Sequence, residues 1–380
     1  MRDRKGESMQ YRPFGKTGVL VSALGFGAMR LPMTTDGQHV DEERAIPVIH
    51  RAFELGVNLV DTAPYYCKRE SEIIVGKALR DWPHPIYLST KNPIEDGSGA
   101  NWRTRLEQSL RKLDRDYVDF YHMWGISWKT YEERVSVPDG PLEAAQRAKA
   151  EGLIKHMSFS FHDTPDALVR IIDSGNFETM LVQYNLLDRK NEAAIHHAHA
   201  NGLGVAIMGP VGGGRLGVAS PEFELLLPGR VSTPALALRF VLAHPGVSMA
   251  LSGMSTVAMV EENVAVASQA GSLSPDDLTR VKAAMEENQR LAELYCTGCE
   301  YCMPCPNDVN IPKNFEYMNY FRAYGLEQAA RDLYGQLGKE GTLVKGLPAS
   351  ACVECGECEP KCPQNIPIIK QLRATAEALS

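Results

Sequence analysis

The sequence lacks three features, and each absence excludes a large class of proteins. It has no excess of basic residues: 40 lysines and arginines stand against 47 acidic residues, a net charge of −7, which is not the cationic balance of a nucleic-acid-binding protein. It has no apolar run long enough to cross a bilayer. Its charged first eight residues have no apolar stretch behind them, unlike a signal peptide. We therefore expect a cytoplasmic protein with neither nucleic acid nor membrane among its partners.

Cysteine is almost absent from the first three quarters of the chain. Cys67 stands alone there, whereas the other eight cysteines lie between Cys296 and Cys362. Closely spaced thiols favour metal binding in a reducing compartment over a disulfide framework. We predict a cysteine-poor body over residues 1–294, ending in a packing helix over 275–294, and a cysteine-rich domain over residues 295–380.

The body alternates short apolar runs with helical patterns. Strands are predicted over residues 21–26, 57–60, 86–90, 118–122, 154–159, 180–183, 205–208 and 247–251. Helices are predicted over residues 41–55, 71–80, 102–113, 141–150, 165–174, 192–200, 234–243 and 257–267. Eight such pairs in about 250 residues indicate a (β/α)8 TIM barrel. An open doubly wound sheet is the alternative, but it seldom needs eight consecutive repeats.

Polar residues follow the predicted strands at their carboxyl ends. They are Asp61, Lys91, His122, Ser160, Gln183 and Gly209. Taken singly, such a lysine is usually solvated and such a histidine is usually a hydrogen-bonded core residue. In a barrel, however, the carboxyl ends of all strands meet at one mouth, where active sites lie. Their repetition on consecutive strands therefore favours a shared site.

Several motifs of the body resemble those of the aldo-keto reductases. They are QYRPFGKTG at residues 10–18, LGFGAMR at 24–30, DTAPYY at 61–66, STK at 89–91 and DFYH at 119–122. The resemblance extends from about Gln10 to Ser268. It implies a catalytic tetrad of Asp61, Tyr66, Lys91 and His122. It also implies hydride transfer between a nicotinamide cofactor and an aldehyde, a ketone or the matching alcohol.

The chemistry of carbonyl reduction explains this choice of residues. The carbonyl oxygen must be protonated as hydride arrives, and a phenol with a pKa near ~10 is a weak acid at neutral pH. The ammonium of Lys91 should lower the pKa of Tyr66, the general acid. Asp61 would keep Lys91 charged and in place, and His122 would orient the carbonyl oxygen.

The same resemblance implies a nicotinamide site. Ser160 and Gln183 match positions that hold the carboxamide, and Gly253, Glu262 and Asn263 match the segment around the adenine end. NAD and NADP both remain open, because a methionine, Met259, stands where an arginine often binds the 2′-phosphate of NADP.

A glycine-rich segment, GGGRLG at residues 212–217, fits the pattern G-x-G-x-x-G. A long loop follows it instead of a helix, so a Rossmann fingerprint is a weak interpretation. We interpret Gly212 and Arg215 as part of a loop that closes over the cofactor pyrophosphate.

The tail carries two runs of four cysteines. The first is Cys296-x2-Cys299-x2-Cys302-x2-Cys305-Pro, and the second is Cys352-x2-Cys355-x2-Cys358-x3-Cys362-Pro, which has bacterial ferredoxin spacing. Each run supplies enough thiolates for one [4Fe–4S] cluster. Zinc is the alternative, but compact quartets followed by proline favour iron.

A helix is predicted between these runs, over residues 315–337, so the tail resembles an α-helical two-cluster ferredoxin domain. That resemblance implies one cluster held by Cys296, Cys299, Cys302 and Cys362. It implies a second cluster held by Cys352, Cys355, Cys358 and Cys305.

Two functions fit the whole chain. The first is an oxidoreductase that uses NAD or NADP on a small carbonyl or alcohol substrate and carries two [4Fe–4S] clusters. The clusters would be structural, or would serve an electron-transfer partner or a flavin. The second is a redox sensor or electron-transfer protein that keeps the barrel as a cofactor-binding module.

Overall fold

The structure is a computed structural model, and it describes residues 8–229, 231–269, 273–293, 296, 302–342, 344–362 and 366–380. The chain divides into two compact units. The first comprises residues 1–212 and 237–273, and the second comprises residues 213–236 and 274–380. This division differs from the expected boundary at 294/295, because an internal segment and helix α11 (Pro275–Glu293) belong to the second unit.

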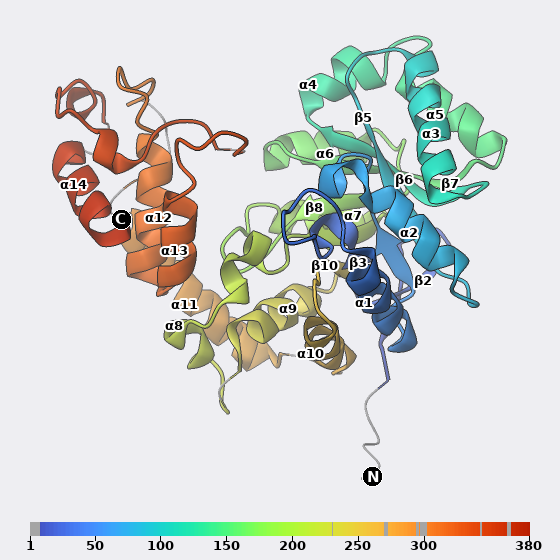
Figure 1. Cartoon of the computed structure of the whole chain (residues 1–380), viewed down its shortest axis with the longest axis horizontal. Helices are drawn as coiled ribbons and strands as arrows, with labels where there is room; N and C mark the ends of the chain where they lie inside the picture. Colours follow the sequence, from blue (N-terminus) through green and yellow to red (C-terminus); the bar gives the residue numbers. More distant parts are fainter. Residues whose placement is uncertain are drawn as a thin grey trace. The chain divides into compact units, whose positions relative to one another are not determined.

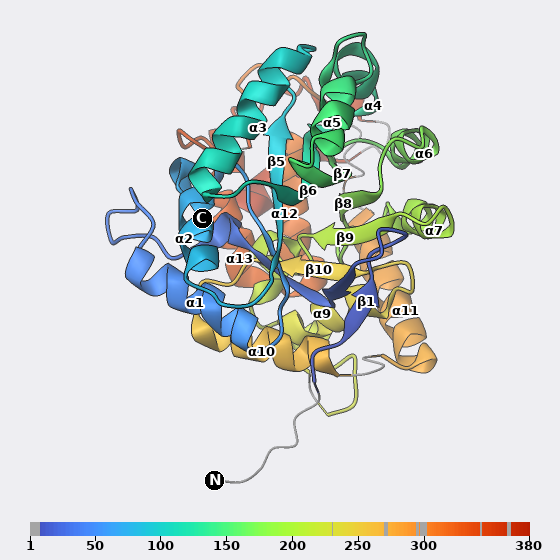
Figure 2. The ribbon, with the colours of Figure 1, turned by 90° about the vertical axis from the view of Figure 1, so that its right-hand side faces the viewer.

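Eight parallel strands of the first unit close into a barrel, in the order β10-β3-β4-β5-β6-β7-β8-β9. The predicted (β/α)8 fold is therefore confirmed, and Figures 1 and 2 show helices arranged around these strands. The strands are β3 (Leu24–Gly27), β4 (Leu59–Asp61), β5 (Tyr87–Pro93), β6 (Val118–Ile126), β7 (Ile154–Phe161), β8 (Thr179–Gln183), β9 (Gly204–Met208) and β10 (Met249–Ser252). The helices that follow them are α1 (Glu42–Glu54), α2 (Ser71–Arg80), α3 (Gly99–Leu113), α5 (Pro141–Ala150), α6 (Pro165–Asp173), α7 (Glu192–Ala200), α9 (Thr233–Ala243) and α10 (Val257–Ser268).

The first predicted strand is divided in two. Strand β2 (Leu20–Ser22) pairs antiparallel with β1 (Tyr11–Pro13), whereas β3 enters the barrel. The chain changes sheet at Ala23, and the hydroxyl of Ser22 donates a hydrogen bond to the carbonyl of Leu24 across this point (2.7 Å). A run of apolar residues could not reveal this change of partner, because both halves are buried to similar extents.

A hydrophobic cluster contributed by the strands and the N-terminal segment packs inside the first unit. It comprises Phe14, Val21, Leu59, Phe120, Leu181, Ala206, Met249 and Leu251. Gly25 on β3 is required by this packing, since a Cβ atom there would lie 2.5 Å from the sulfur of Met249. Burial of each large side chain of this kind stabilises the fold by roughly 1.5–3 kcal/mol. The barrel thus forms a rigid support for the residues at its mouth.

The second unit is mostly helical among its described residues. It contains α8 (Pro221–Glu224), α11, α12 (Ile311–Tyr324), α13 (Glu327–Tyr334) and α14 (Ile368–Leu379). The segment predicted to be helical over 315–337 is helical, but it is divided into α12 and α13, because α12 ends before Gly325, which adopts a left-handed conformation (φ 56°). A side chain at this position would also collide with the carboxylate of Glu222.

The internal segment 213–236 packs within the second unit against α12. The hydroxyl of Ser220 donates to the carbonyl of Tyr324 (2.9 Å), and the ring of Phe223 stacks on that of Tyr324 with centroids 6.3 Å apart. Phe223 is fully buried. None of the described helices in either unit has the length and apolar character needed to span a bilayer.

Candidate active site

Three residues of the predicted tetrad lie side by side on neighbouring strands. Asp61 is the last residue of β4, Lys91 lies near the end of β5, and His122 lies on β6 directly opposite Lys91 in the register. Their side chains are buried, with 4%, 2% and 3% of their surface exposed. The structure therefore brings together three ionisable groups in a site shielded from water.

A buried ion pair connects the first two residues. The ammonium of Lys91 donates to Asp61 Oδ2 (2.5 Å) and to the carbonyl of Thr62 (2.7 Å). The hydroxyl of Ser89 donates to the other oxygen of Asp61. Burial acts to raise the pKa of Asp61, but the charge of Lys91 and the neighbouring His122 hold it below its ordinary value. Burial acts to lower the pKa of Lys91, and the charge of Asp61 reverses this, so that both groups stay ionised.

The fourth member, Tyr66, begins the short turn η2 (Tyr66–Arg69) above the end of β4. Its ring centroid lies 4.7 Å from Lys91 Nζ, and its ring meets Trp124 edge-on at 5.8 Å. Burial raises the pKa of Tyr66 above its ordinary value, although the charge of Lys91 acts to lower it. The expected net lowering by Lys91 is therefore absent here, because the loss of solvation outweighs the neighbouring charge.

His122 completes the group in its neutral form. Burial lowers the pKa of His122 below its ordinary value, against the opposing influence of Asp61. Its Nε2 lies 3.6 Å from Asp61 Oδ1, and its buried Nδ1 has no hydrogen-bond partner among the described residues. A neutral imidazole retains one donor and one acceptor, which suits a group that orients a polar substrate atom.

The turn after Tyr66 has an unusual backbone. Cys67, Lys68 and Arg69 all adopt positive φ angles (48°, 53° and 76°), which residues other than glycine rarely do. The loop before α1 holds this turn in place: Lys68 Nζ donates to Gln38 Oε1 (2.6 Å), and the thiol of Cys67 lies 3.4 Å from the carbonyl of Met29.

An ion pair fastens the same loop just beyond the turn. His39 Nδ1 lies 2.6 Å from Glu70 Oε1, and the amide of Val40 donates to Glu70 Oε2 (2.7 Å). The hydrogen bond to Glu70 raises the pKa of His39. The position of Tyr66 therefore depends on contacts that are far away in the sequence.

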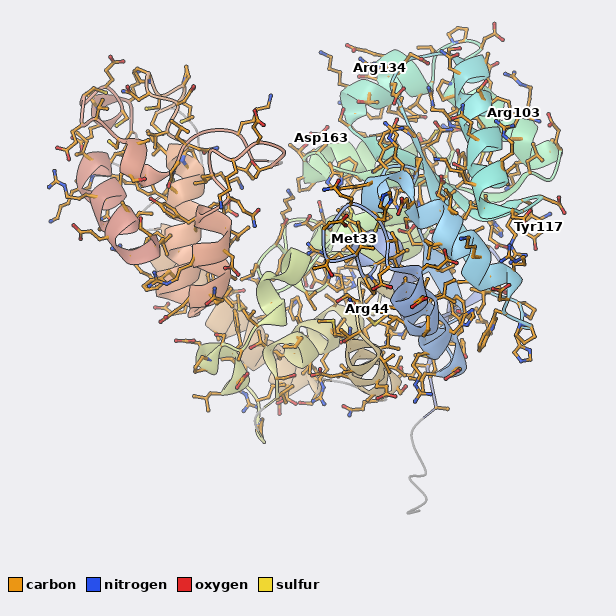
Figure 3. All side chains as sticks on the ribbon, viewed as in Figure 1. Met33, Arg44, Arg103, Tyr117, Arg134 and Asp163 are labelled. Atoms are coloured by element: carbon orange, nitrogen blue, oxygen red, sulfur yellow. The ribbon has the colours of Figure 1, made fainter. Side chains whose placement is uncertain are left out.

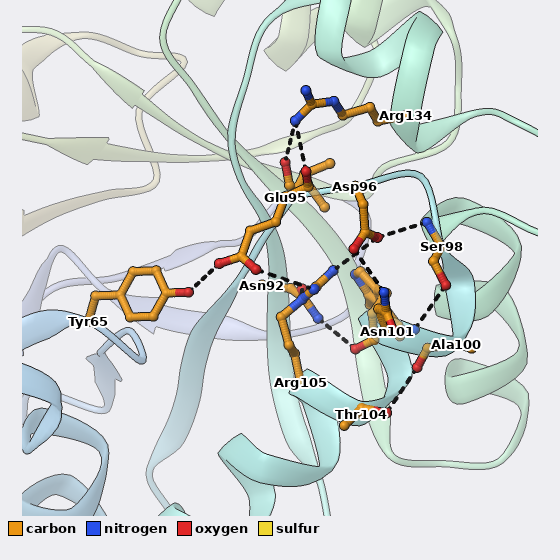
Figure 4. Close-up of polar contacts among 12 residues, drawn as sticks. Tyr65, Asn92, Glu95, Asp96, Ser98, Ala100, Asn101, Thr104, Arg105 and Arg134 are labelled. Atoms are coloured by element: carbon orange, nitrogen blue, oxygen red, sulfur yellow. Dashed lines mark hydrogen bonds and ion pairs between the residues drawn. The ribbon is translucent and has the colours of Figure 1, made fainter.

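A second polar network begins at Tyr65, the residue before Tyr66 (Figure 4). The hydroxyl of Tyr65 donates to Glu95 Oε1 (2.5 Å), Arg105 Nη1 lies 3.7 Å from Glu95 Oε2, and Arg105 Nε donates to Asn92 Oδ1 (2.9 Å). The ring of Tyr65 also lies 5.4 Å from that of Trp124. The network thus connects the residue before Tyr66 with the residue after Lys91. The sequence indicated Tyr65 only by its place in the motif DTAPYY.

Strand β6 itself contributes one aromatic side chain to this region, Trp124. Trp124 contacts Tyr66, as described above. Trp128 instead lies under the guanidinium of Arg170 (3.9 Å) and against Tyr131, which packs on Phe177. Trp124 therefore borders the tetrad, whereas Trp128 and Tyr131 pack on one another.

Ser160 and Gln183 lie at the carboxyl ends of β7 and β8, at the same mouth of the barrel. Ser160 Oγ accepts a hydrogen bond from the amide of Gly125 (2.7 Å), and Gln183 Nε2 donates to Asp188 Oδ2 (3.2 Å). A carboxamide would therefore compete with, or share, existing hydrogen bonds.

The residues expected around the adenine end follow β10. Gly253 comes directly after the strand, Asn263 Nδ2 donates to Ser252 Oγ (3.2 Å), and Glu262 is exposed on α10. Met259 on the same helix is 46% exposed, so its side chain fills no core position.

The glycine-rich segment forms the turn η4 (Gly212–Gly217), with left-handed glycines at 212, 213 and 214. The division between the two compact units falls directly after Gly212. Arg215 belongs to the second unit, and its side chain lies outside the described residues.

Cysteines from both runs meet at one cavity of the second unit. They are Cys302, Cys305, Cys352, Cys355 and Cys358. Cys296 and Cys362 are half-buried, and Cys299 lies outside the described residues. Sulfur donors suit soft or borderline metals, so this group fits an iron–sulfur cluster or zinc. Cys302 and Cys305 of the first run thus lie beside Cys352, Cys355 and Cys358 of the second.

Comparison with known proteins gives two family matches. A family described as "Aldo/keto reductase family" matches residues 23–220, and one described as "4Fe-4S dicluster domain" matches residues 295–366. L-galactose dehydrogenase from Arabidopsis thaliana is 30% identical over 313 residues, which cover 74% of this chain and 96% of that protein.

Solved structures give a similar result. The holo form of aldo-keto reductase AKR11C1 from Bacillus halodurans has a TM-score of 0.62 and 30% identity, and the match covers 72% of this chain and 96% of that one. An aldo/keto reductase from Klebsiella pneumoniae in complex with NADP and acetate has a TM-score of 0.59 and 25% identity. That match covers 73% of this chain and 95% of the other.

Proposed function

This chain belongs to the aldo/keto reductase family and carries a 4Fe-4S dicluster domain, and we propose that it transfers hydride between a nicotinamide cofactor and an aldehyde, a ketone or the matching alcohol. The observation that carries this proposal is the buried Lys91–Asp61 ion pair beside the phenol of Tyr66. A buried ammonium that stays charged stabilises the phenolate that forms when the neighbouring phenol gives up its proton.

In the direction of reduction, Tyr66 is the proton donor. Its raised pKa keeps the phenol protonated at neutral pH. The phenolic proton moves to the substrate oxygen as the carbonyl carbon accepts hydride, and the tyrosinate that remains is stabilised by the ammonium of Lys91. Asp61 keeps that ammonium charged without reaching the substrate. In alcohol oxidation the same proton returns to Tyr66.

His122 and Trp124 act on the substrate without taking its proton. The neutral imidazole of His122 orients the oxygen that Tyr66 protonates. Trp124 lies edge-on to Tyr66, and its indole presents an apolar surface to the group bonded to the carbonyl carbon.

The bound nicotinamide cofactor supplies the hydride. The residues that would hold it are Ser160, Gln183, Gly212, Arg215, Gly253, Glu262 and Asn263, as the family resemblance implies. The hydroxyl of Ser160 and the amide of Gln183 have the donor and acceptor chemistry that a carboxamide requires. Both NADH and NADPH have to be tested, because the neutral Met259 is exposed where a 2′-phosphate would need a cation.

Two [4Fe–4S] clusters would be held by the eight cysteines of the tail, which fit them by number and by donor type. Each cluster exchanges one electron at a time, whereas hydride carries two. We propose that the clusters stabilise the second unit, because a small domain needs such cross-links in addition to its core.

The test is the conservative change Tyr66→Phe, with Tyr117→Phe as the control. Tyr117 is 45% exposed and precedes β6 at the amino end of that strand, far from the carboxyl ends that carry the tetrad; Figure 3 shows it at the periphery of the first unit. The substrate panel would include L-galactose and methylglyoxal, after the names of two relatives. Removal of the phenolic proton should abolish turnover, whereas quenching of protein fluorescence should show unchanged cofactor binding. Full turnover by Tyr66→Phe would contradict the proposal.

A further inference from the structure

A second cavity lies beside the loop that carries Tyr66. It has a volume of about 310 Å³ and is bordered by residues of the β4–α2 connection, the end of β5 and α3. Of the tetrad, Lys91 lines this cavity, whereas Tyr66 and His122, the residues proposed to contact the substrate, do not. Four cationic side chains lie in its wall: Arg69, Lys91, Arg105 and Lys112. Lys91 is paired with Asp61, whereas the ion pairs of Arg105 and Lys112 are long (3.4–3.8 Å) and Arg69 has none among the described residues.

Arg105 shows this most clearly (Figure 4). Its Nε is fixed by the bond to Asn92, which directs the rest of the guanidinium. Its Nη1 lies 3.7 Å from Glu95 and its Nη2 lies 3.8 Å from Asp96, both beyond hydrogen-bonding distance. Nη2 is buried and has no hydrogen-bond partner in the described part of the chain. A buried orphan donor on a cation is costly, and it indicates an oxygen atom that the protein itself does not provide.

Arg69 and Lys112 also carry N–H donors that could bind a ligand oxygen. Arg69 lies over the ring of Tyr65, 4.6 Å from its centroid, and no carboxylate within the described residues pairs with it. That stacking leaves the in-plane N–H donors of its guanidinium available. Lys112 Nζ donates one long hydrogen bond to Glu72 Oε2 (3.4 Å), and an ammonium carries two further N–H donors.

Another arginine of the same helix forms ion pairs at ordinary hydrogen-bonding distance. Arg103, two residues before Arg105 on α3, donates to Glu151 at 2.7 Å and to Glu107 at 2.8 Å. The loose geometry around the cavity is therefore not a general property of α3. Glu95 is the acidic residue in the cavity wall, and one of its oxygens is occupied by the hydroxyl of Tyr65.

We propose that this cavity is a binding site for a small oxyanion, the phosphate or carboxylate group of a metabolite, held by Arg69, Arg105 and Lys112. Guanidinium groups bind such anions through two parallel hydrogen bonds, and the amide of Gln108 in the same wall adds a neutral donor. The volume is at the lower end of the range for small-molecule sites, roughly 300–1,000 Å³. It therefore accommodates a compact ligand.

The test is calorimetric titration of the anaerobically purified full-length protein with inorganic phosphate and, separately, with acetate, at constant ionic strength. We expect saturable one-site binding of at least one anion. Phosphate alone would identify a phosphate-bearing ligand, acetate alone a carboxylate, and both a general oxyanion site. Heats that follow only the ionic strength would overturn the proposal.

Arg69 is the position to vary, because its side chain is exposed and has no hydrogen bond to lose. Arg69→Gln should weaken binding about tenfold, Arg69→Lys should restore part of the affinity, and Arg103→Gln should leave it unchanged. Equal affinities in Arg69→Gln and in the unmodified protein would also overturn the proposal. The measurement needs neither cofactor nor turnover, so its outcome is independent of the proposed reaction.

Discussion

Removal of the ammonium of Lys91 is the sharpest test of how the tetrad works. In Lys91→Met the phenolate of Tyr66 loses a positive charge that lies 4.7 Å from the ring centroid. In an effective dielectric constant of about 20 this charge is worth about 3.5 kcal/mol to the phenolate. The carboxylate of Asp61 cancels part of that energy, so the figure is an upper value. If about half of the phenolate charge has developed in the transition state, the barrier rises by about 1.7 kcal/mol, or roughly 20-fold in rate.

The reaction equilibrium constrains the result further. Because a substitution cannot change the overall equilibrium, kcat/KM should fall by the same factor for carbonyl reduction and for alcohol oxidation at one pH. Both are measured by the absorbance of the reduced nicotinamide. The matched control is Lys77→Met, since Lys77 forms an ion pair of similar length with Glu42 (2.6 Å) on the outer helices. A fall of less than twofold in Lys91→Met, or an equal fall in Lys77→Met, would refute the reasoning.

Three further predictions concern the surroundings of the tetrad and the tail. Tyr65→Phe removes the bond to Glu95 and loosens the segment before Tyr66, so kcat should fall about threefold to tenfold while cofactor affinity stays constant; an unchanged kcat would exclude this role. The pKa of His39 is raised by Glu70, so the pair is intact below about pH 6.5 and is lost as the pH rises through that raised value; a histidine NMR titration should show a lower pKa in Glu70→Gln. Cys355→Ala should halve the iron content, from about eight to about four per chain, as two [4Fe–4S] clusters require; unchanged iron would contradict the ligand set.

The sequence predicted the barrel well, because the alternation of strand and helix is a local signal that repeats eight times. It predicted poorly where individual strands and helices are interrupted. The change of sheet at Ala23 depends on which strand each half pairs with. The end of α12 at Gly325 depends on the left-handed backbone there and on the carboxylate of Glu222, about a hundred residues earlier. Contacts between segments that are distant in the sequence do not change the local hydrophobic pattern, so that pattern could not reveal these breaks.

The candidate site was also predicted only as far as local sequence motifs allow. The motifs placed Asp61, Lys91 and His122 on adjacent strand ends, and the structure brings them within reach of one another. The sign of the pKa change of Tyr66 could not be predicted, because it depends on how deeply the phenol is buried. The loose contacts of Arg105 were also invisible, since a lone arginine on a predicted helix gives no indication of the cavity beside it.

The packing of Phe223 on Tyr324 has a practical consequence for anyone who wishes to obtain the barrel alone. The chain leaves the first unit after β9 and returns to it within α9, and the segment between these points has its apolar partners in the second unit. A truncation after residue 273 would leave this excursion in place and strip away the surface that covers it. Shortened forms should therefore aggregate unless residues 213–236 are replaced by a short polar turn. The two units are not consecutive in the sequence, so one of them cannot be transferred to another protein by a single cut in the chain.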